Sequence, residues 1–417
     1  MRRIIAVLML HLSFAGLFSQ INRFGTPVTR SYAMQVTQSS EFNYCITKDK
    51  SGIIYIGNND NVVLRYDGTS WTRIPVRENT TTAIYAIGAD ENGIVYVGGL
   101  DEFGYIEPDS TGLAHYVSLN ERLAGAKDLT GNTVADLREK TPEASDFAIG
   151  NIYSLIIKDS RVYYLSERTL IIYDRAADSL SFVNLRPLGF RQCMRIFLIN
   201  NRIIITDNNY GLFEYTDGHI SRLPGGEFFG YKMNFTILPY KDDRVIVATF
   251  SSGIYLYNYV TGVIDSSFIE RKMFNKLKEL NVYCGARLHS GEIVLGTVAD
   301  GLFVFDENGK YTGNWNSKNT DMQDNTIYAL YSDPSANTEL WIVTDGFISK
   351  AYVNFPFYQF SAKSGLEGGI NNFCEFEGSV YISTDNGIYV SGITEDGSRT
   401  FKQFSDITDQ AFPLTVA

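Results

Sequence analysis

The sequence predicts an all-β fold in which four-stranded sheets form the blades of a β-propeller. The chain has 417 residues, more than a single compact core usually supports. It contains 27 Tyr and 27 Phe but only 10 Pro, a composition typical of strands. A unit of four expected strands also recurs, mostly every 40 to 48 residues, and this is the period of a propeller blade.

The repeat is recognised by an apolar strand that ends in Gly, Ser or Thr. The residues aligned on the end of this strand mark eight units: Asn58, Gly99, Glu167, Asp207, Thr249, Thr297, Thr344 and Thr384. Seven units also carry, 11 to 16 residues earlier, an aromatic residue followed by a small one. These pairs are Tyr44-Cys45, Tyr85-Ala86, Tyr153-Ser154, Phe235-Thr236, Tyr283-Cys284, Tyr328-Ala329 and Phe373-Cys374; the departure is Gln192-Cys193.

Each unit is expected to contain four consecutive antiparallel strands. The first holds the aromatic and small pair, and a polar turn such as Asp49-Lys50-Ser51-Gly52 leads to the second. A short Gly-bearing loop precedes a third strand that ends in an aromatic residue, as in residues 63–66. Asp67-Gly68 then turns the chain into a fourth strand at residues 70–74.

This count predicts three segments. Met1-Arg2-Arg3 and the apolar run at residues 4–18 indicate a signal peptide over residues 1–19. Residues 20–355 are expected to form a first propeller of seven blades, with a polar surface insertion at about 120–148. After the Pro-marked junction Phe355-Pro356-Phe357, residues 356–417 are expected to form the first blade of a second, incomplete propeller. The alternative is a single eight-bladed ring.

Charge and hydropathy restrict the setting in which the chain acts. The signal peptide predicts export to the periplasm or the extracellular space. No later stretch of about 18 apolar residues predicts a membrane span. The net charge is −11 and no Lys/Arg cluster stands out, so nucleic acid is not an expected partner.

The sequence offers no recognisable catalytic or metal centre. The four cysteines, Cys45, Cys193, Cys284 and Cys374, are predicted to occupy equivalent positions in four different blades and to remain free thiols. Acidic turns such as Asp90-Glu91-Asn92-Gly93 lack the last acidic ligand of a calcium loop. Beyond the signal peptide only His115, His219 and His289 remain, without a hydrolase motif. We therefore expect no enzymatic activity, no cofactor and no metal.

The loops between the second and third strands of the units carry carboxamide, carboxylate and aromatic groups. Equivalent loops of a propeller lie on one face, so these groups should converge around one mouth, where they suit a neutral polyhydroxylated ligand. The candidate ligand-binding residues are Asn58, Asn59, Asp60, Asp101, Glu102, Phe103, Arg168, Asn208, Tyr210, Phe250 and Asp300. The alternative is that Asn, Asp and Gly are only what tight loops require.

Residues 40–400 resemble the blades of the two-component regulator propeller family, most closely at residues 49–57, 293–306, 340–344 and 380–389. The start of the chain, at residues 43–49, 66–68 and 98–105, is similar to such sensors in the Bacteroidetes. The family's exported sensor has two seven-bladed propellers and a β-sandwich, followed by a membrane helix and an output module, often a histidine kinase. The resemblance implies a sensing region that binds an oligosaccharide or a protein and signals through domains absent here, with a dimer through those domains as one option. A secreted propeller enzyme acting on polysaccharide and a non-catalytic scaffold are the alternatives.

Overall fold

The computed structural model describes residues 25–77, 82–128, 130–134, 136, 149–190, 192–333, 338–353, 358–360, 362–393 and 399–404. The predicted signal peptide and the predicted junction at residues 355–357 lie outside this part of the chain. Two compact units are present. One comprises Thr29–Val353, and the other combines Met1–Val28 with Asn354–Ala417.

The described residues of the larger unit form seven sheets, each with four antiparallel strands. In six sheets these four strands are consecutive in the chain, and one of the six has an additional fifth strand. The seventh sheet takes one of its four strands from the start of the chain. From the inner to the outer strand, the sheets are β3 (Asn43–Lys48), β4 (Ile54–Asn58), β5 (Val62–Tyr66) and β6 (Trp71–Pro75); β7 (Ile84–Ala89), β8 (Val95–Gly99), β9 (Glu102–Pro108) and β10 (Ala114–Ser118); β12 (Ile152–Lys158), β13 (Arg161–Ser166), β14 (Thr169–Asp174) and β15 (Ser179–Asn184); β16 (Cys193–Ile199), β17 (Arg202–Asp207), β18 (Gly211–Thr216) and β19 (His219–Arg222); β20 (Asn234–Pro239), β21 (Arg244–Thr249), β22 (Ile254–Asn258) and β23 (Ile264–Asp265); β24 (Val282–Arg287), β25 (Ile293–Thr297), β26 (Leu302–Phe305) and β27 (Tyr311–Trp315); and β28 (Ile327–Ser332), β29 (Glu339–Thr344), β30 (Phe347–Tyr352) and β2 (Thr29–Ala33).

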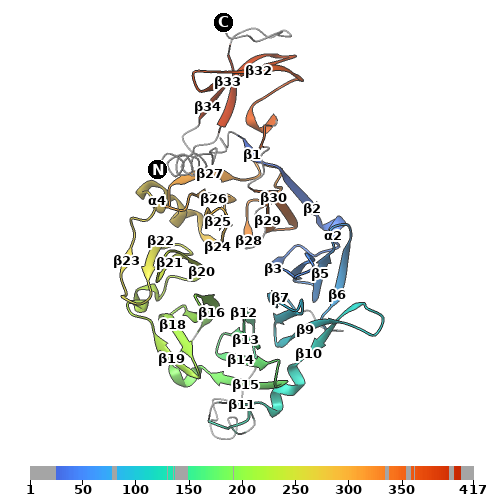
Figure 1. The fold of residues 1–417 in the computed structure, drawn as a ribbon, viewed down its shortest axis with the longest axis vertical. Coiled ribbons are helices and arrows are strands. Elements are labelled where there is room, and N and C mark those ends of the chain that lie inside the picture. Colours follow the sequence, from blue (N-terminus) through green and yellow to red (C-terminus); the bar gives the residue numbers. More distant parts are fainter. Residues whose placement is uncertain are drawn as a thin grey trace, which may run out of the picture. The chain divides into compact units, whose positions relative to one another are not determined.

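The inner strands of these sheets gather around the centre of the unit (Figure 1). Each contacts the next in the order β3, β7, β12, β16, β20, β24 and β28, and β28 contacts β3, which closes the ring. The last sheet takes its outer strand from the start of the chain, because β2 pairs with β30 from Thr29 opposite Ala351 to Ala33 opposite Phe347. The predicted all-β arrangement of four-stranded sheets is therefore confirmed.

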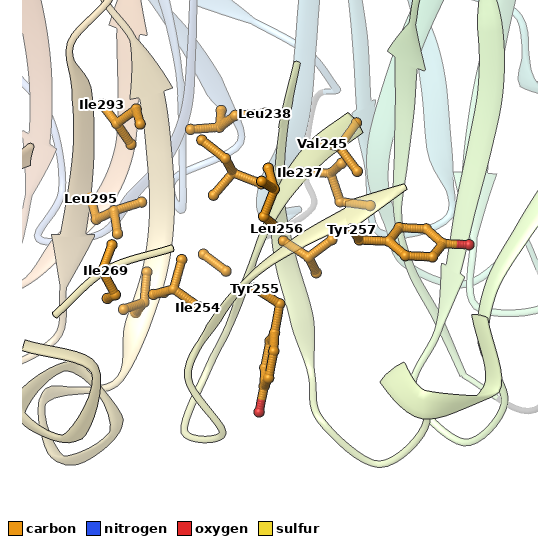
Figure 2. Close-up of a cluster of buried hydrophobic side chains, with 14 of the residues drawn as sticks. Ile237, Leu238, Val245, Ile254, Tyr255, Leu256, Tyr257, Ile269, Ile293 and Leu295 are labelled. Carbon is orange, nitrogen blue, oxygen red and sulfur yellow. The ribbon is translucent and has the colours of Figure 1, made fainter. Parts of the chain in front are cut away.

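Helices are short and lie in the connections between sheets. They are α2 (Met34–Thr37), η1 (Asn120–Gly125), η3 (Arg186–Leu188), η4 (Gly226–Phe229) and α4 (Arg271–Leu280). Among the described helices only α4 is longer than two turns, and it buries Met273, Phe274 and Leu277, which recur on one helical face. This face joins the cluster of apolar side chains from β16 to β26, ten of which Figure 2 labels.

The insertion at about 120–148 contributes to the core, which differs from the surface role predicted for it. Leu123, Ala126 and Val134 are buried, and they pack with side chains of the sheet β12–β15. The short strand β11 (Lys127–Asp128) pairs in parallel with β15 and adds a fifth strand to that sheet. Apolar residues are interspersed among the charged and polar residues of this segment. Its polar average composition therefore did not reveal that some of its side chains are buried.

The smaller unit holds a separate four-stranded sheet. Its strands are β32 (Ile370–Phe376), β33 (Ser379–Thr384), β34 (Gly387–Ile393) and β35 (Arg399–Gln403). Within the same unit, η5 (Ala362–Ser364) precedes the sheet, and β1 (Thr26–Pro27) pairs with β31 (Tyr358–Gln359). Leu366, Ile382, Tyr389 and Phe401 form its small core.

Neighbouring sheets of the larger unit approach closely where a glycine in the second strand faces a small residue in the first. A Cβ atom on Gly57 would lie 2.7 Å from the carbonyl oxygen of Ile84, which belongs to the next inner strand, and would also clash with Cys45. Gly98 and Gly296 face Ile152 and Ile327 of the following sheets in the same way. The predicted pattern of small residues therefore makes room for the next blade.

We expect Gly57→Ala to lower the free energy of unfolding by about 1–3 kcal/mol, because the backbone of Ile84 cannot move without separating two blades. Thermal melting followed by circular dichroism would measure the change. Gly125→Ala is the matched control, since a Cβ there meets no atom within 4 Å. Equal melting temperatures for both variants would contradict this account of blade packing.

Candidate functional site

Each of the seven inner strands contains one extra residue at the same position, a β-bulge. In β3, Asn43 pairs with Asn58 and Cys45 pairs with Gly57, so that Tyr44 between them is left without a partner. The other six inner strands shift register in the same way. The bulged residues are Tyr44, Tyr85, Tyr153, Met194, Phe235, Tyr283 and Tyr328. The six aromatic ones line a central channel of about 270 Å³.

Neighbouring aromatic rings contact one another around this channel. The distances between ring centroids are 5.5 Å for Tyr85–Tyr153, 4.9 Å for Tyr44–Tyr85, 6.2 Å for Tyr44–Tyr328, 5.9 Å for Tyr283–Tyr328 and 4.9 Å for Phe235–Tyr283. We call these six residues the aromatic ring of the channel. The succession is interrupted only between Tyr153 and Phe235, where the bulged residue is Met194.

Arg195 fills this interruption. Its Nη1 donates hydrogen bonds to the carbonyl oxygens of Tyr153, at 3.0 Å, and Met194, at 3.2 Å. The guanidinium carbon lies 5.4 Å from the centroid of Phe235, a distance at which a cation interacts with the face of the ring. One cation therefore lines the channel together with the aromatic ring and a seventh aromatic side chain, Phe197.

The phenols of Tyr44 and Tyr153 are protonated at neutral pH. Burial raises the pKa of Tyr44 to about 12, and the neighbouring Tyr85 and Tyr328 add to the shift. Burial also raises the pKa of Tyr153, and the negative charge of Glu167 is the second cause of this shift. Glu167 Oε1 accepts a hydrogen bond of 3.2 Å from the phenol. The channel mouth thus presents hydroxyl groups and aromatic faces, both of which suit a polyhydroxylated ligand.

The small residues that follow the bulge include two thiols that also line the channel, those of Cys45 and Cys284. Cys45 Sγ donates to the carbonyl oxygen of Ile84 at 3.5 Å, and Cys284 Sγ donates to that of Ile327 at 3.7 Å. Burial raises the pKa of both thiols to about 12, although Arg195 opposes the shift. Burial, with Asp207, also raises the pKa of Cys193. All four cysteines are free, as predicted.

The assigned positions of two cysteines were wrong. Cys193 pairs with Asp207 as Asn43 pairs with Asn58, so Arg195, and not Cys193, occupies the small position of its blade. In β32 the bulge falls between Ile370 and Asn372, which makes Asn371-Asn372 the equivalent pair in place of Phe373-Cys374. Phe373 is 71% exposed. A strand's pattern alone does not reveal where its bulge lies.

We expect at most one thiol, that of Cys374, to react with a chromogenic disulfide reagent in the native protein at about pH 8. A pKa of about 12 for Cys45 and Cys284 leaves about one thiolate in ten thousand at that pH. Absorbance would count the reacting thiols before and after denaturation, when all four should react. Cys374→Ser should abolish the native reaction. Two or more reactive thiols in the native chain would contradict the burial described here.

The predicted ligand-binding loops lie at the same end of the sheets as the aromatic ring. The bulge is near the start of each inner strand, which pairs with the end of the second strand, and the loop to the third strand begins there. Of the candidate residues, Asn59, Asp60, Arg168 and Tyr210 are exposed, and Asp101, Phe250 and Asp300 are half-buried. Phe250 reaches the aromatic ring directly, with its centroid 5.8 Å from that of Phe235.

Four predicted residues are buried and hold the fold together. Asn58 Nδ2 donates to Asn43 Oδ1 at 2.8 Å, and Asn208 is 6% exposed. Phe103 is fully buried against Tyr164. Glu102 Oε1 accepts hydrogen bonds from the hydroxyls of Tyr116, at 3.0 Å, and Ser118, at 2.5 Å. Asp101 and Glu102 line a separate cavity of about 520 Å³, together with Arg77 and Asn120.

Three features of this end of the sheets were not predicted from the sequence. Arg195 is one. Tyr231 and Met233 are the second; they are 82% and 45% exposed and adopt positive φ angles of 58° and 47°, which are uncommon for such residues. The third is Asp345, whose pKa is raised by burial and by the charges of Asp324 and Glu41. Tyr231 and Met233 follow the Gly-rich stretch at residues 225–230, the one sequence signal that marked this loop.

No group of three or more His, Cys, Asp or Glu side chains within the described residues is placed to bind a metal ion. His115, His219 and His289 are all exposed and do not line the channel. Among the helices that the structure describes, none combines the length and the apolar character needed to cross a membrane.

Comparison with known proteins bears on the fold. No protein-family model and no curated protein matches the chain. Among solved structures, it is similar to the extracellular domain of the hybrid two-component system BT4673 from B. thetaiotaomicron, with a TM-score of 0.57 and 17% identity over 91% of this chain and 48% of that one. The corresponding domain of BT3049 from B. thetaiotaomicron gives a TM-score of 0.60 and 15% identity over 93% and 55%.

The fold is that of these β-propeller sensor domains. The chain spans about half their length. They match the family that the blade motifs resemble. The fold is not restricted to sensors, since virginiamycin B lyase from Staphylococcus aureus gives a TM-score of 0.56 with 12% identity, over 78% of this chain and 99% of the lyase.

Proposed function

We propose that this chain is the extracytoplasmic sensing region of a two-component-type receptor and that the channel mouth binds a glycan fragment. The aromatic ring carries the proposal. Six aromatic side chains converge at one end of the larger unit, with polar loops around them, and sugars bind by stacking on such faces while their hydroxyls exchange hydrogen bonds. The similar extracellular domains of sensors support the signalling context, and the signal-peptide pattern at residues 1–19 supports export.

We further propose that residues 356–417 begin a second propeller. β32 and β33 repeat the inner-strand bulge of the seven sheets, and their unit is separate from the closed ring of Thr29–Val353. The chain's coverage of about half of the sensor domains is consistent with a second ring completed by residues beyond this chain. In this scheme the bound state is passed to an output module in the remainder of the receptor, and a partner protein is the alternative ligand.

A polysaccharide lyase is the second candidate, because the fold also matches a lyase and because Tyr153 and Glu167 form a hydrogen-bonded pair at the mouth. A phenol that removes a proton needs a lowered pKa. The pKa of Tyr153 is raised by burial and by Glu167. The pair therefore favours binding over catalysis.

We expect Tyr283→Ala to weaken oligosaccharide binding roughly 10-fold, because one stacking face of the aromatic ring is lost. A thermal-shift screen of neutral and acidic oligosaccharides would identify a ligand, and calorimetry would give the affinity. Tyr283→Phe should bind almost as well as the native chain if stacking dominates. Tyr240→Ala, which changes a tyrosine beyond the opposite end of β20, is the control.

Two results would count against this proposal. If no oligosaccharide shifts the melting temperature, a glycan is not the ligand. Cleavage products from any of them, found by chromatography, would instead favour the lyase.

A further inference from the structure

We infer that the ligand of the channel carries an anionic group, a carboxylate or a sulfate ester, and that Arg195 binds it. This inference rests on the proposed function and names the class of saccharide. It starts from the one inner strand that departs from the repeat.

Arg195 stands where the other six inner strands carry a small side chain. A residue at this position comes directly after the bulged residue and pairs with the next-to-last residue of the second strand. Cys45 pairs with Gly57 in this way, and Arg195 pairs with Thr206. The six small residues are Cys45, Ala86, Ser154, Thr236, Cys284 and Ala329. A side chain as long as arginine does not fit the tight space between blades, so it extends into the channel, which it lines.

The guanidinium is only partly used by the protein. Both of its hydrogen bonds come from Nη1, and within the described chain Nε and Nη2 donate to no other group. No carboxylate of the described residues lies within 4.0 Å of it to form an ion pair. Nε and Nη2 form one edge of the guanidinium fork, the geometry that binds a carboxylate or sulfate through two parallel hydrogen bonds.

The charge distribution around the channel is asymmetric. Arg195 is the one charged side chain in the described lining, which otherwise consists of aromatic, aliphatic, thiol and hydroxyl groups. The acidic groups lie beyond this lining. Glu167 Oε1 accepts a hydrogen bond from the Tyr153 phenol, and Asp345 adds to the effect of burial, which raises the pKa values of Tyr44 and Tyr328. A cation that is partly removed from water and has no counterion is costly, and an anionic ligand would supply the counterion.

The arrangement of Arg195 and the aromatic side chains would also orient the ligand in the channel. Arg195 lies over the ring of Phe235, and Tyr283 stacks on Phe235, so an acidic sugar in the channel would contact this aromatic pair while its anionic group meets the guanidinium. Its neutral hydroxyls would then point toward Tyr44 and Tyr328, on the side where Asp345 would repel a second anion. The site is therefore suited to a saccharide with its charge at one end.

Calorimetry with the whole chain tests the inference, with a uronate-containing disaccharide, a sulfated disaccharide and a neutral disaccharide as probes. We expect one of the two acidic probes to bind, with an affinity that falls as salt is raised. Arg195→Gln should weaken this binding at least about 10-fold, since a charge-assisted pair of hydrogen bonds is lost. Arg195→Lys should retain part of it. Whichever acidic probe binds identifies the carboxylate or the sulfate as the anion.

Arg222→Gln is the matched control. Arg222 ends the outer strand β19 of the same sheet and stacks on Phe213 at 5.3 Å, much as Arg195 stacks on Phe235, but it does not line the channel. This variant should bind the acidic probe as the native chain does. Thermal melting of all three variants shows whether each is folded, and Arg195→Lys keeps the test valid if Arg195→Gln is not.

The outcomes separate the inference from the proposed function. The inference is wrong, and the glycan proposal stands, if the neutral disaccharide binds the native chain as tightly as the tighter-binding acidic probe. The same conclusion follows if Arg195→Gln and Arg195→Lys both bind the acidic probe with native affinity. If none of the three probes nor any oligosaccharide of the wider screen binds, both are wrong.

Discussion

The close approach of consecutive inner strands is the constraint on which the rest of the larger unit depends. The isoleucine of one inner strand packs where the preceding sheet offers a glycine and a small side chain, as Ile84 does against Gly57 and Cys45. Gly98 and Gly296 make the same close approach to Ile152 and Ile327 at two further junctions. The apolar clusters between sheets, such as the one shown in Figure 2, then fill the wider space toward the rim.

The same constraint creates the candidate site. An inner strand that must keep small side chains toward its neighbours has room for large ones only toward the axis, and the bulge directs one residue there in each sheet. Aromatic side chains at that position contact one another around the ring. Packing between blades and the aromatic ring thus use neighbouring positions of the same strands. Arg195 is the exception, because it stands at a packing position and still lines the channel.

The repeat could be predicted from the sequence because the packing requirement recurs. A glycine or small residue at each junction and an aromatic residue before it, as in Tyr44-Cys45 and Tyr283-Cys284, leave a regular pattern. A structural feature that occurs only once in the chain leaves no such repeating pattern in the sequence. β2 is a single strand whose partner, β30, lies more than 300 residues away, and α4 lies in one connection only.

The predicted ligand-binding residues remain a prediction, although the structure shows where each of them lies. The loops lie at the same end of the sheets as the aromatic ring, but polar type alone does not distinguish Asn58, whose amide binds the carbonyl of Phe42 and the side chain of Asn43, from the exposed Asn59. Arg195 was missed because the local match favoured Gln192-Cys193, and only the pairing of β16 with β17 fixes the bulge two residues later.

The strand β2 also determines how the larger unit responds to force. The chain enters the unit at Thr29 and leaves it after Tyr352, and these two positions lie at the same end of the ladder between β2 and β30. Tension applied between the two crossing points would peel that ladder open from Thr29 and Ala351 onward, one backbone pair at a time, and would not shear all its hydrogen bonds together. Such tension therefore acts first on the sheet that closes the ring, where the covalent path into the smaller unit begins.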